Sequence, residues 1–302
     1  MSKQTDKRRH ILSESEINEL YCLPRLNNIQ REQSFSLADE ELKAVNQQIS
    51  LSSKVYFILL LGYFREKPFI AQFCFRDVKD DLKYVVNRYY PGQTPPRKNP
   101  SRSHVYSLRR KLLGMLHYRN LDGDIKPHLY TYLADVATIC AEPRYLFDES
   151  LAFFARERVA LPRYTAIQEL VSRVLIAESQ RMETILVGCM RKKTKQRLVD
   201  LLSSSDSITR LGKLKKPAKD FSFSEINREI ESHRALMDIY PQAKVAIDKL
   251  DISPRNLAYY SGLVHYYIVT KLRRFSHEKA CLYLLCYIIA VPQVSLESEL
   301  CL

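Results

Sequence analysis

Residues 51–70 read LSSKVYFILLLGYFREKPFI, and within them Val55–Phe64 is an unbroken run of ten largely apolar residues. A second such run, Cys281–Val291, has eleven residues, and both fall far short of the ~20 that a helix needs to cross a bilayer. They therefore predict helices buried in a protein core. The chain has only 7 Gly against 13 Pro, and no Trp, which disfavours a fold of many tight turns. We expect an all-α protein without a substantial sheet.

Helical spacing extends outward from this run. Ser36 and Asp39 give an S-x-x-D start to a helix that ends near Ile49, and Asp77–Tyr90 carries one apolar stripe before Pro91. Together these predict three short helices before residue 92, compatible with helix-turn-helix-like DNA-binding bundles. Further helices are expected at about 104–118, 127–141 and 147–159, in a long stretch after Pro162, and at about 224–238, 241–250 and 255–290.

Composition divides the chain into successive segments, and 302 residues allow two or three domains of about 100–150 residues. Residues 91–103, PGQTPPRKNPSRS, are typical of an exposed connector. The expected segments are an N-terminal helical bundle (1–96), a basic connector with a second helical DNA-binding unit (97–160), a long amphipathic helix with a basic linker (161–220), a C-terminal helical segment (221–289) and a tail (290–302) in which Pro292 breaks the helix.

The chain carries 47 Lys and Arg against 34 Asp and Glu, a formal charge of +13 that favours a polyanionic partner. The excess is local, since residues 82–121 hold nine bases and no acid, and residues 184–219 hold ten bases and two acids. Such clusters neutralise phosphates and release counterions. A solvated basic face is the alternative. The expected DNA-binding residues are Arg97, Lys98, Arg102, His104, Arg109, Arg110, Lys111, Arg119, Arg191, Lys192, Lys193, Lys195, Arg197, Lys213, Lys215 and Lys216.

The mode of contact stays open at this stage. Ser101, Ser103, Tyr106 and Ser107 are interleaved with the first cluster and could donate hydrogen bonds to phosphates or to base edges. The connector 97–103 could equally enter a minor groove, as flexible basic arms do.

No motif for catalysis is found. The seven histidines contain no H-x-x-x-H pair, and there is no P-loop and no G-x-S-x-G. Asp122 and Asp124 flank Gly123, where a turn with local Asx hydrogen bonds is favoured over a divalent-ion site. The seven scattered cysteines include no C-x-x-C, which predicts free thiols and no structural zinc. We expect no catalytic residue, metal ligand or cofactor in this chain.

Four segments resemble, in order, the N-terminal half of transposases of the Tn-three family. They are ILSESEINELYCLP (11–24), FSLADEELKAVNQQISLSSKVYFILLLGYFREKPFI (35–70), LPRYTAIQELVSRVLIAES (161–179) and NLAYYSGLVHYYIVTKLRRFSHEKACLYLLCYII (256–289). The most specific pieces are LLLGYFREKPF (59–69), LPRYTAIQELV (161–171), YYSGLVHYYIVTKLRRF (259–275) and LYLLCY (282–287). The resemblance covers residues 10–289.

This resemblance implies helical domains that recognise the terminal inverted repeats of a transposon, in double-stranded DNA, during replicative transposition. In that family the chemistry belongs to a Mg²⁺-dependent domain with a D-D-E triad much further along the chain. None of that domain is present here, so this chain alone is not expected to be catalytically active. The chain departs from the family pattern at 290–302, AVPQVSLESELCL, which we interpret as a non-native tail after a truncation or frameshift.

The resemblance also implies a bacterial, nucleoid-associated protein. The charged start Met1–His10, with no apolar segment after it, predicts a cytoplasmic protein without a signal peptide, and no membrane partner is expected. Self-association through apolar surface is compatible with the sequence, which contains no motif for it. The alternative function is a basic helical module that binds RNA or an acidic protein without reading DNA sequence. A self-contained enzyme is a third and weaker reading.

Overall fold

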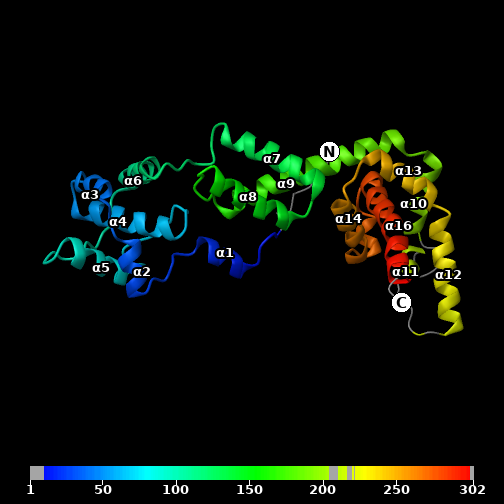
Figure 1. The fold of residues 1–302 in the computed structure, drawn as a ribbon, viewed down its shortest axis with the longest axis horizontal. Helices are drawn as coiled ribbons and strands as arrows, with labels where there is room; N and C mark the ends of the chain where they lie inside the picture. Colours follow the sequence, from blue (N-terminus) through cyan, green and yellow to red (C-terminus); the bar gives the residue numbers. More distant parts are fainter. Residues whose placement is uncertain (1–9, 204–209, 216–219, 221, 300–302) are drawn as a thin grey trace. The chain divides into compact units, whose positions relative to one another are not determined.

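A computed structural model describes residues 10–203, 210–215, 220 and 222–299, and within them all regular structure is helical (Figure 1). This confirms the all-α prediction. None of these helices combines the length and apolarity that a bilayer crossing requires. The helices are α1 (Glu14–Tyr21), α2 (Asn28–Ser34), α3 (Asp39–Asn46), α4 (Leu51–Glu66), α5 (Lys79–Tyr89), α6 (Arg102–Met115), α7 (Ile125–Ile139), α8 (Pro143–Arg156), α9 (Tyr164–Cys189), α10 (Lys192–Leu202), α11 (Arg210–Leu214), α12 (Phe223–Met237), α13 (Tyr240–Leu250), α14 (Pro254–Tyr266), α15 (Val269–Leu272) and α16 (His277–Glu299).

The chain forms two compact units. Unit 1 comprises residues 1–129 and 147–170, and unit 2 comprises residues 130–146 and 171–302. This division differs from the expected segments, which placed a boundary at residue 96. The physical reason is that α6 packs against α4 and buries Leu108, Leu112 and Leu113 in the same hydrophobic core as residues 26–86. Residues 97–118 therefore complete the first core.

Helix α4 is the centre of unit 1. All ten residues from Val55 to Phe64 are buried, because α2, α3, α5 and α6 all pack against this helix. A helix that is apolar all round has no solvent face and can only be stable when it is enclosed on every side. The apolar run therefore acts as the predicted core helix.

Gly62 lets a neighbouring ring approach the backbone of α4. A Cβ at this position would lie 2.3 Å from Phe35 Cδ1, and that ring is fully buried. The ring of Phe35 also makes an edge contact with Tyr63, with 5.7 Å between the ring centroids. The glycine is thus required by close packing in the middle of a helix.

A buried polar network holds α2 and α5 to the central helix. Tyr63 OH donates a 2.6 Å hydrogen bond to Asp81 Oδ2, and Arg31 Nε donates a 2.7 Å bond to Asp81 Oδ1. Only 11% of the Asp81 side chain is exposed. A buried carboxylate needs such partners, and here each oxygen has one.

The described residues 10–91 form five helices, where we predicted three. The two that were missed, α1 and α2, begin with capping boxes, in which Ser13 pairs with Glu16 and Asn27 pairs with Gln30. Both pairs match a sequence signature that could have found them. The predicted cap at Ser36 is wrong, since α3 begins after Ala38, whose amide donates to Glu41 Oε2 at 2.8 Å.

Three chain segments of unit 1 meet at a short backbone junction. The Leu161 amide donates to the Pro68 carbonyl (2.7 Å), and the Ala160 amide donates to the Arg119 carbonyl (2.8 Å). Tyr21 OH also donates to the Pro162 carbonyl at 2.8 Å. The motifs LLLGYFREKPF and LPRYTAIQELV, 91 residues apart from end to start, are thereby joined. Their contact positions segments that line a cavity beside α6, which is described below.

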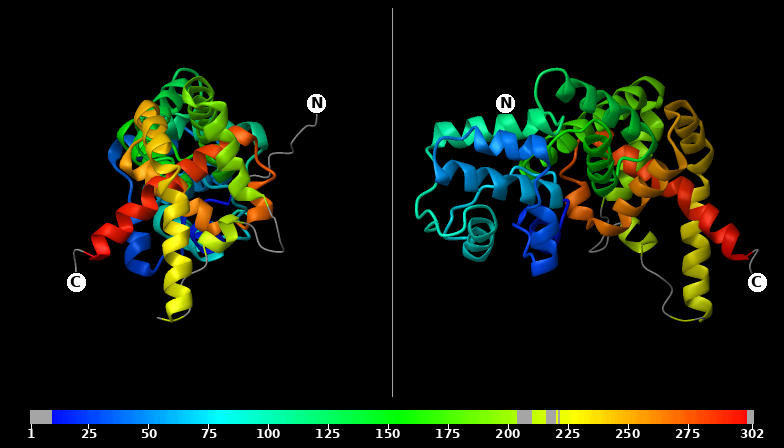
Figure 2. Two further views of the ribbon diagram at one scale, coloured as in Figure 1. Left: turned by 90° about the vertical axis from the view of Figure 1, so that its right-hand side faces the viewer. Right: turned by 60° about the vertical axis from the view of Figure 1, so that its left-hand side comes forward.

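Unit 2 is built round α16, whose residues Cys281–Ile289 are all buried. Helices α10, α13 and α14 pack against it, and two views of the ribbon place these helices together (Figures 1 and 2). Asn256 is fully buried and caps the end of α7. Its Nδ2 donates to the carbonyls of Ala137 and Thr138, at 2.9 and 3.0 Å, while its Oδ1 accepts from the Ala141 amide.

Two predictions for the C-terminal region are wrong. The expected helix 255–290 is divided into α14, α15 and α16, because Tyr267 and Ile268 adopt extended backbone conformations and the Ser276 hydroxyl accepts the amide of Lys279. Pro292 also does not end the last helix, since α16 continues to Glu299. A proline removes only one amide donor from a helix, so the helix can continue past it.

Candidate nucleic-acid interface

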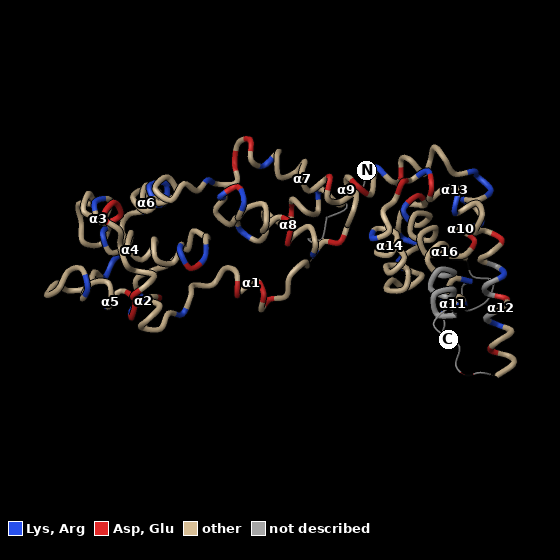
Figure 3. Tube along the Cα trace, viewed as in Figure 1, with Lys and Arg blue, Asp and Glu red and all other residues tan. Residues whose placement is uncertain are grey.

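Helix α6 carries an exposed stripe of basic and aromatic side chains. Arg102, Tyr106 and Arg110 are spaced four residues apart, so they share one helical face, and all three are exposed. Leu108 and Leu112 are buried on the opposite side. Figure 3 shows Lys and Arg along α6 without an acidic residue among them. Within the described part of the chain, neither Arg102 nor Arg110 forms an ion pair. We call these three residues the α6 stripe.

The structure separates the three consecutive bases 109–111. Only Arg110 is exposed, because successive helical residues point about 100° apart. Arg109 is half-buried and donates to the Ala71 carbonyl (3.4 Å), and Lys111 donates to the Ala44 carbonyl and to Gln47 Oε1, at 3.1 and 2.6 Å. The half-buried Lys111 ammonium thus donates to acceptors at the C-terminal end of α3.

Arg109 also places a positive charge below the surface. Burial raises the pKa of Tyr56, and the nearby Arg109 guanidinium, which is hydrogen-bonded to that phenol, opposes the rise. Arg109 Nε is buried and has no acceptor among the described residues. The Arg109 guanidinium therefore packs within unit 1, and its Nε remains a donor without an acceptor among the described residues.

The connector before α6 is fixed to the core. Asn99 Oδ1 accepts the Phe75 amide (3.0 Å), its Nδ2 donates to the Phe73 carbonyl (2.8 Å), and Ser52 Oγ donates to the Lys98 carbonyl (2.7 Å). This backbone attachment leaves the side chains of Arg97 and Lys98 exposed. The connector is therefore a loop anchored to the core by hydrogen bonds. This disfavours the alternative that residues 97–103 act as a flexible arm in a minor groove.

Two further expected residues are less accessible or already paired. His104 is half-buried, and its Nε2 finds no hydrogen-bond partner in the described structure. Arg119 pairs with Glu157, with 3.4 Å between Nη2 and Oε2, although more than half of its side chain is exposed. Its charge is partly neutralised, so it is a weaker candidate for a phosphate contact than Arg110.

A cavity of about 360 Å³ opens beside the α6 stripe, and we call it the α6 pocket. It is formed by α6, by the segment after α4 and by the junction segments described above. Apolar side chains that include Phe69, Leu113 and Leu161 form much of its wall. None of its described lining residues is acidic. The polar lining residues are Gln72, Tyr106, Arg109, Arg110, Asn120 and Arg163.

The second basic cluster lies in unit 2 and is more engaged in internal contacts. Arg191, Lys192 and Lys193 are exposed at the start of α10. Lys195 pairs with Glu278 at 2.5 Å, a contact that raises the pKa of the lysine and lowers that of the carboxyl. Lys215 donates to the Tyr267 carbonyl at 2.7 Å, and burial lowers its pKa. Lys216 lies outside the described residues.

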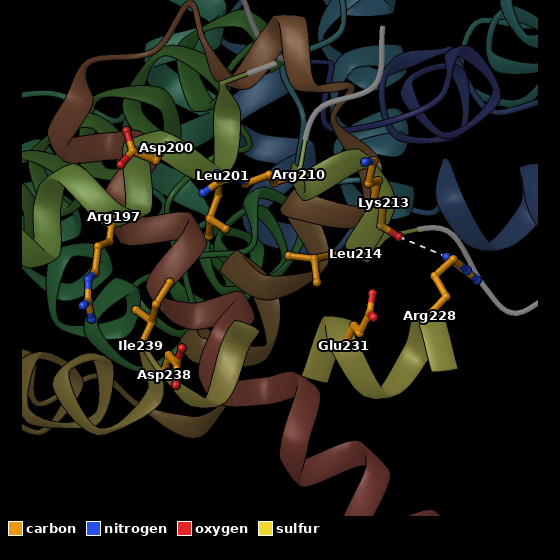
Figure 4. Close-up of a pocket in the computed structure, with 10 residues that line it drawn as sticks. All are labelled: Arg197, Asp200, Leu201, Arg210, Lys213, Leu214, Arg228, Glu231, Asp238 and Ile239. Atoms are coloured by element: carbon orange, nitrogen blue, oxygen red, sulfur yellow. Dashed lines mark hydrogen bonds between the residues drawn. The ribbon is translucent and has the colours of Figure 1, made fainter. Parts of the chain in front are cut away.

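A cavity of about 440 Å³ lies between α10, α11 and α12 in unit 2 (Figure 4). Figure 4 shows Arg197 and Lys213 at its wall together with Arg228, whose Nη1 donates to the Lys213 carbonyl at 3.4 Å. Four cationic residues line it, but three carboxylates do so as well, Asp200, Glu231 and Asp238. The opposing charges weaken its attraction for phosphate, so the α6 pocket is the better anion site.

No group of three or more His, Cys, Asp or Glu side chains in the described chain could hold a metal ion. Residues 120–125 form a turn in which the Asp122 amide donates to the Asn120 carbonyl and the Ile125 amide donates to the Asp122 carbonyl. Gly123 supplies the left-handed conformation, with φ of +48°. The six described cysteines are free, as predicted, and Cys301 lies outside the described residues.

Sequence reasoning gave no role to Gln72, Asn120 or Arg163. Arg163 is isolated in sequence from the basic clusters, and only the fold brings it to the pocket that Arg110 also lines. Its one sequence signal was its place within the motif LPRYTAIQELV. A search for charge runs cannot find a cation that joins its group through tertiary contacts.

Comparison with known protein families assigns part of the chain to a described domain. A sequence profile of the domain of unknown function DUF4158 matches residues 11–174, more than half of the chain. This range contains α1–α8, the α6 stripe and every residue that lines the α6 pocket. No curated protein matches the chain. The extent of the profile match shows that the chain belongs to the DUF4158 family.

Proposed function

We propose that this chain binds double-stranded DNA at the terminal inverted repeats of a transposable element, as the DNA-recognition part of a transposase. The observation that carries the proposal is the α6 stripe, in which two cations that form no ion pair with any described residue flank an exposed tyrosine. Arginines of this kind bind phosphates or the edge of guanine, and an aromatic side chain packs against sugars or bases. The resemblance to Tn-three family transposases supplies the inverted repeat as the target.

The local charge supports a nucleic-acid partner. Residues 82–121 contain no acid, so the electrostatic attraction of α6 for phosphate is not cancelled by neighbours in sequence. Phosphate contacts release counterions, and binding should therefore weaken steeply as the salt concentration rises.

A basic module for RNA or an acidic protein remains the second candidate, because exposed cations attract any polyanion. A competition gel shift separates the two. Labelled inverted-repeat duplex is bound to the full chain and is competed with unlabelled repeat, with random duplex and with structured RNA. The proposal requires that the repeat compete best. If random duplex or RNA competes equally well, recognition of transposon ends is rejected.

Variants of the α6 stripe test the interface itself. Replacement of Arg102 and Arg110 by Ala should lower the slope of log K against log salt by about 1.8, since each phosphate contact contributes ~0.9. The matched control replaces Lys79 and Lys83, two exposed bases on α5, and removes the same charge. An equal change in both double variants would indicate general attraction with no local interface at α6.

A further inference from the structure

The α6 pocket differs from a surface that only tracks a DNA backbone. Its walls come from α6 and from segments joined by backbone hydrogen bonds, Leu161 to Pro68 and Ala160 to Arg119. A pocket tied in this way is largely formed before a ligand arrives. Its volume of about 360 Å³ lies at the lower end of the ~300–1,000 Å³ range of small-ligand sites.

The lining combines three kinds of chemistry. Phe69, Leu113 and Leu161 provide apolar surface, and Tyr106 is 65% exposed. Arg110 and Arg163 are exposed, and neither has an ion-pair partner in the described structure. Side-chain amides, which can both donate and accept, come from Gln72 and Asn120.

Each kind of group matches one part of a nucleotide. An aromatic ring and apolar walls suit the face of a base, amides suit its hydrogen-bonding edge, and guanidinium groups suit the phosphodiester. A paired base inside a duplex presents no free face. A backbone phosphate alone would leave the apolar walls and the tyrosine ring without a partner.

We propose that the α6 pocket binds one unpaired nucleotide of DNA, with its base against Tyr106 and its phosphodiester at Arg110 and Arg163. This inference rests on the proposed function, since it adds a nucleotide pocket to a DNA-binding unit. The nucleotide can come from a single-stranded end or from a base extruded from the duplex, and the pocket chemistry is the same for both.

The test compares the affinities of the full chain for three labelled DNAs of one sequence by fluorescence anisotropy. One is a blunt duplex, one has an unpaired terminal nucleotide and one has an internal mismatch. Because the unpaired base spares the cost of opening a pair, we expect roughly tenfold tighter binding of at least one of the two interrupted DNAs. Preference for the overhang indicates a single-stranded end, and preference for the mismatch indicates extrusion.

Tyr106→Ala should abolish this preference, so that the three DNAs bind with equal affinity, whereas Tyr106→Phe should retain the preference. Tyr266→Ala, which removes a 78% exposed tyrosine of unit 2, is the matched control and should behave as the unmodified chain. Equal affinity for all three DNAs, or a preference that survives Tyr106→Ala, overturns the pocket proposal alone. If the unmodified chain binds none of the DNAs, the proposed function fails as well.

Discussion

Asp81→Ala should strongly destabilise unit 1, because this carboxylate joins three helices. The change removes the acceptor of Tyr63 OH, at 2.6 Å, and of Arg31 Nε, at 2.7 Å. Only 2% of Tyr63 and 19% of the Arg31 side chain are exposed, so water replaces the lost bonds poorly. A buried hydroxyl left without a partner costs ~1–3 kcal/mol and an unpaired buried cation costs more. We expect Asp81→Ala to lower the free energy of unfolding by about 3–4 kcal/mol. This is near the lower end of the sum of the two costs, because Arg31 stays partly exposed to solvent and keeps its hydrogen bond to Asn28.

The assay is urea denaturation of the full chain, followed by circular dichroism. Hydrogen exchange of the α4 amides assigns the lost stability to unit 1, because two units need not unfold in one transition. Tyr63→Phe alone removes one bond and leaves the ion pair, so it should cost only about 1 kcal/mol.

The two changes together give the decisive result. With Ala at position 81 the Tyr63 hydroxyl has already lost its acceptor, so its removal should cost almost nothing. The double-mutant cycle should therefore show a coupling of about 1 kcal/mol or more. Additive effects, or a loss below about 1 kcal/mol for Asp81→Ala, would refute the reasoning that the network stabilises unit 1.

Three other predictions follow from buried groups. Burial, aided by the bond to Asp81, raises the pKa of Tyr63 above its unfolded value of about 10. The contribution of this phenol to stability should therefore be complete below pH 10 and fall above it by up to ~1.4 kcal/mol per pH unit. Thermal melts should show a weaker loss of stability with pH for Tyr63→Phe, and an equal loss in both proteins would contradict this. Gly62→Ala brings Cβ within 2.3 Å of the packed phenylalanine ring and should lower the urea midpoint by the equivalent of ~1–3 kcal/mol, whereas Gly114→Ala, with open space, should not. Iodoacetamide should label exposed Cys74 far faster than Cys281, which is buried and whose pKa is raised to about 11 by burial; equal rates by mass spectrometry would argue against this packing.

Much of the helical architecture could be predicted from local pattern. The central helix followed from the composition of Val55–Phe64, because a fully apolar helix must be enclosed. Where prediction failed, the decisive interaction was either a cap that was not recognised, as with Ser13 and Asn27, or a long-range contact. A long-range contact also crosses the expected boundary at residue 96, since α6 packs in the core of α4.

Charge runs located the candidate interface only coarsely. The sequence showed that residues 82–121 are basic, but Lys111 caps another helix and Arg109 is half-buried, which leaves Arg110 exposed. Which cation faces solvent depends on helical phase and on the neighbours that each side chain meets.

The sequence by itself determined that this protein is helical, that its core forms round an apolar helix, and that its positive charge is concentrated in two regions. Composition and short-range periodicity carry that information. Only the tertiary structure decided that Arg163 and Asn120 join Arg110 and Tyr106 round one cavity. Contacts between segments up to 93 residues apart, such as that of Leu161 with Pro68, create this site, and no local pattern contains them.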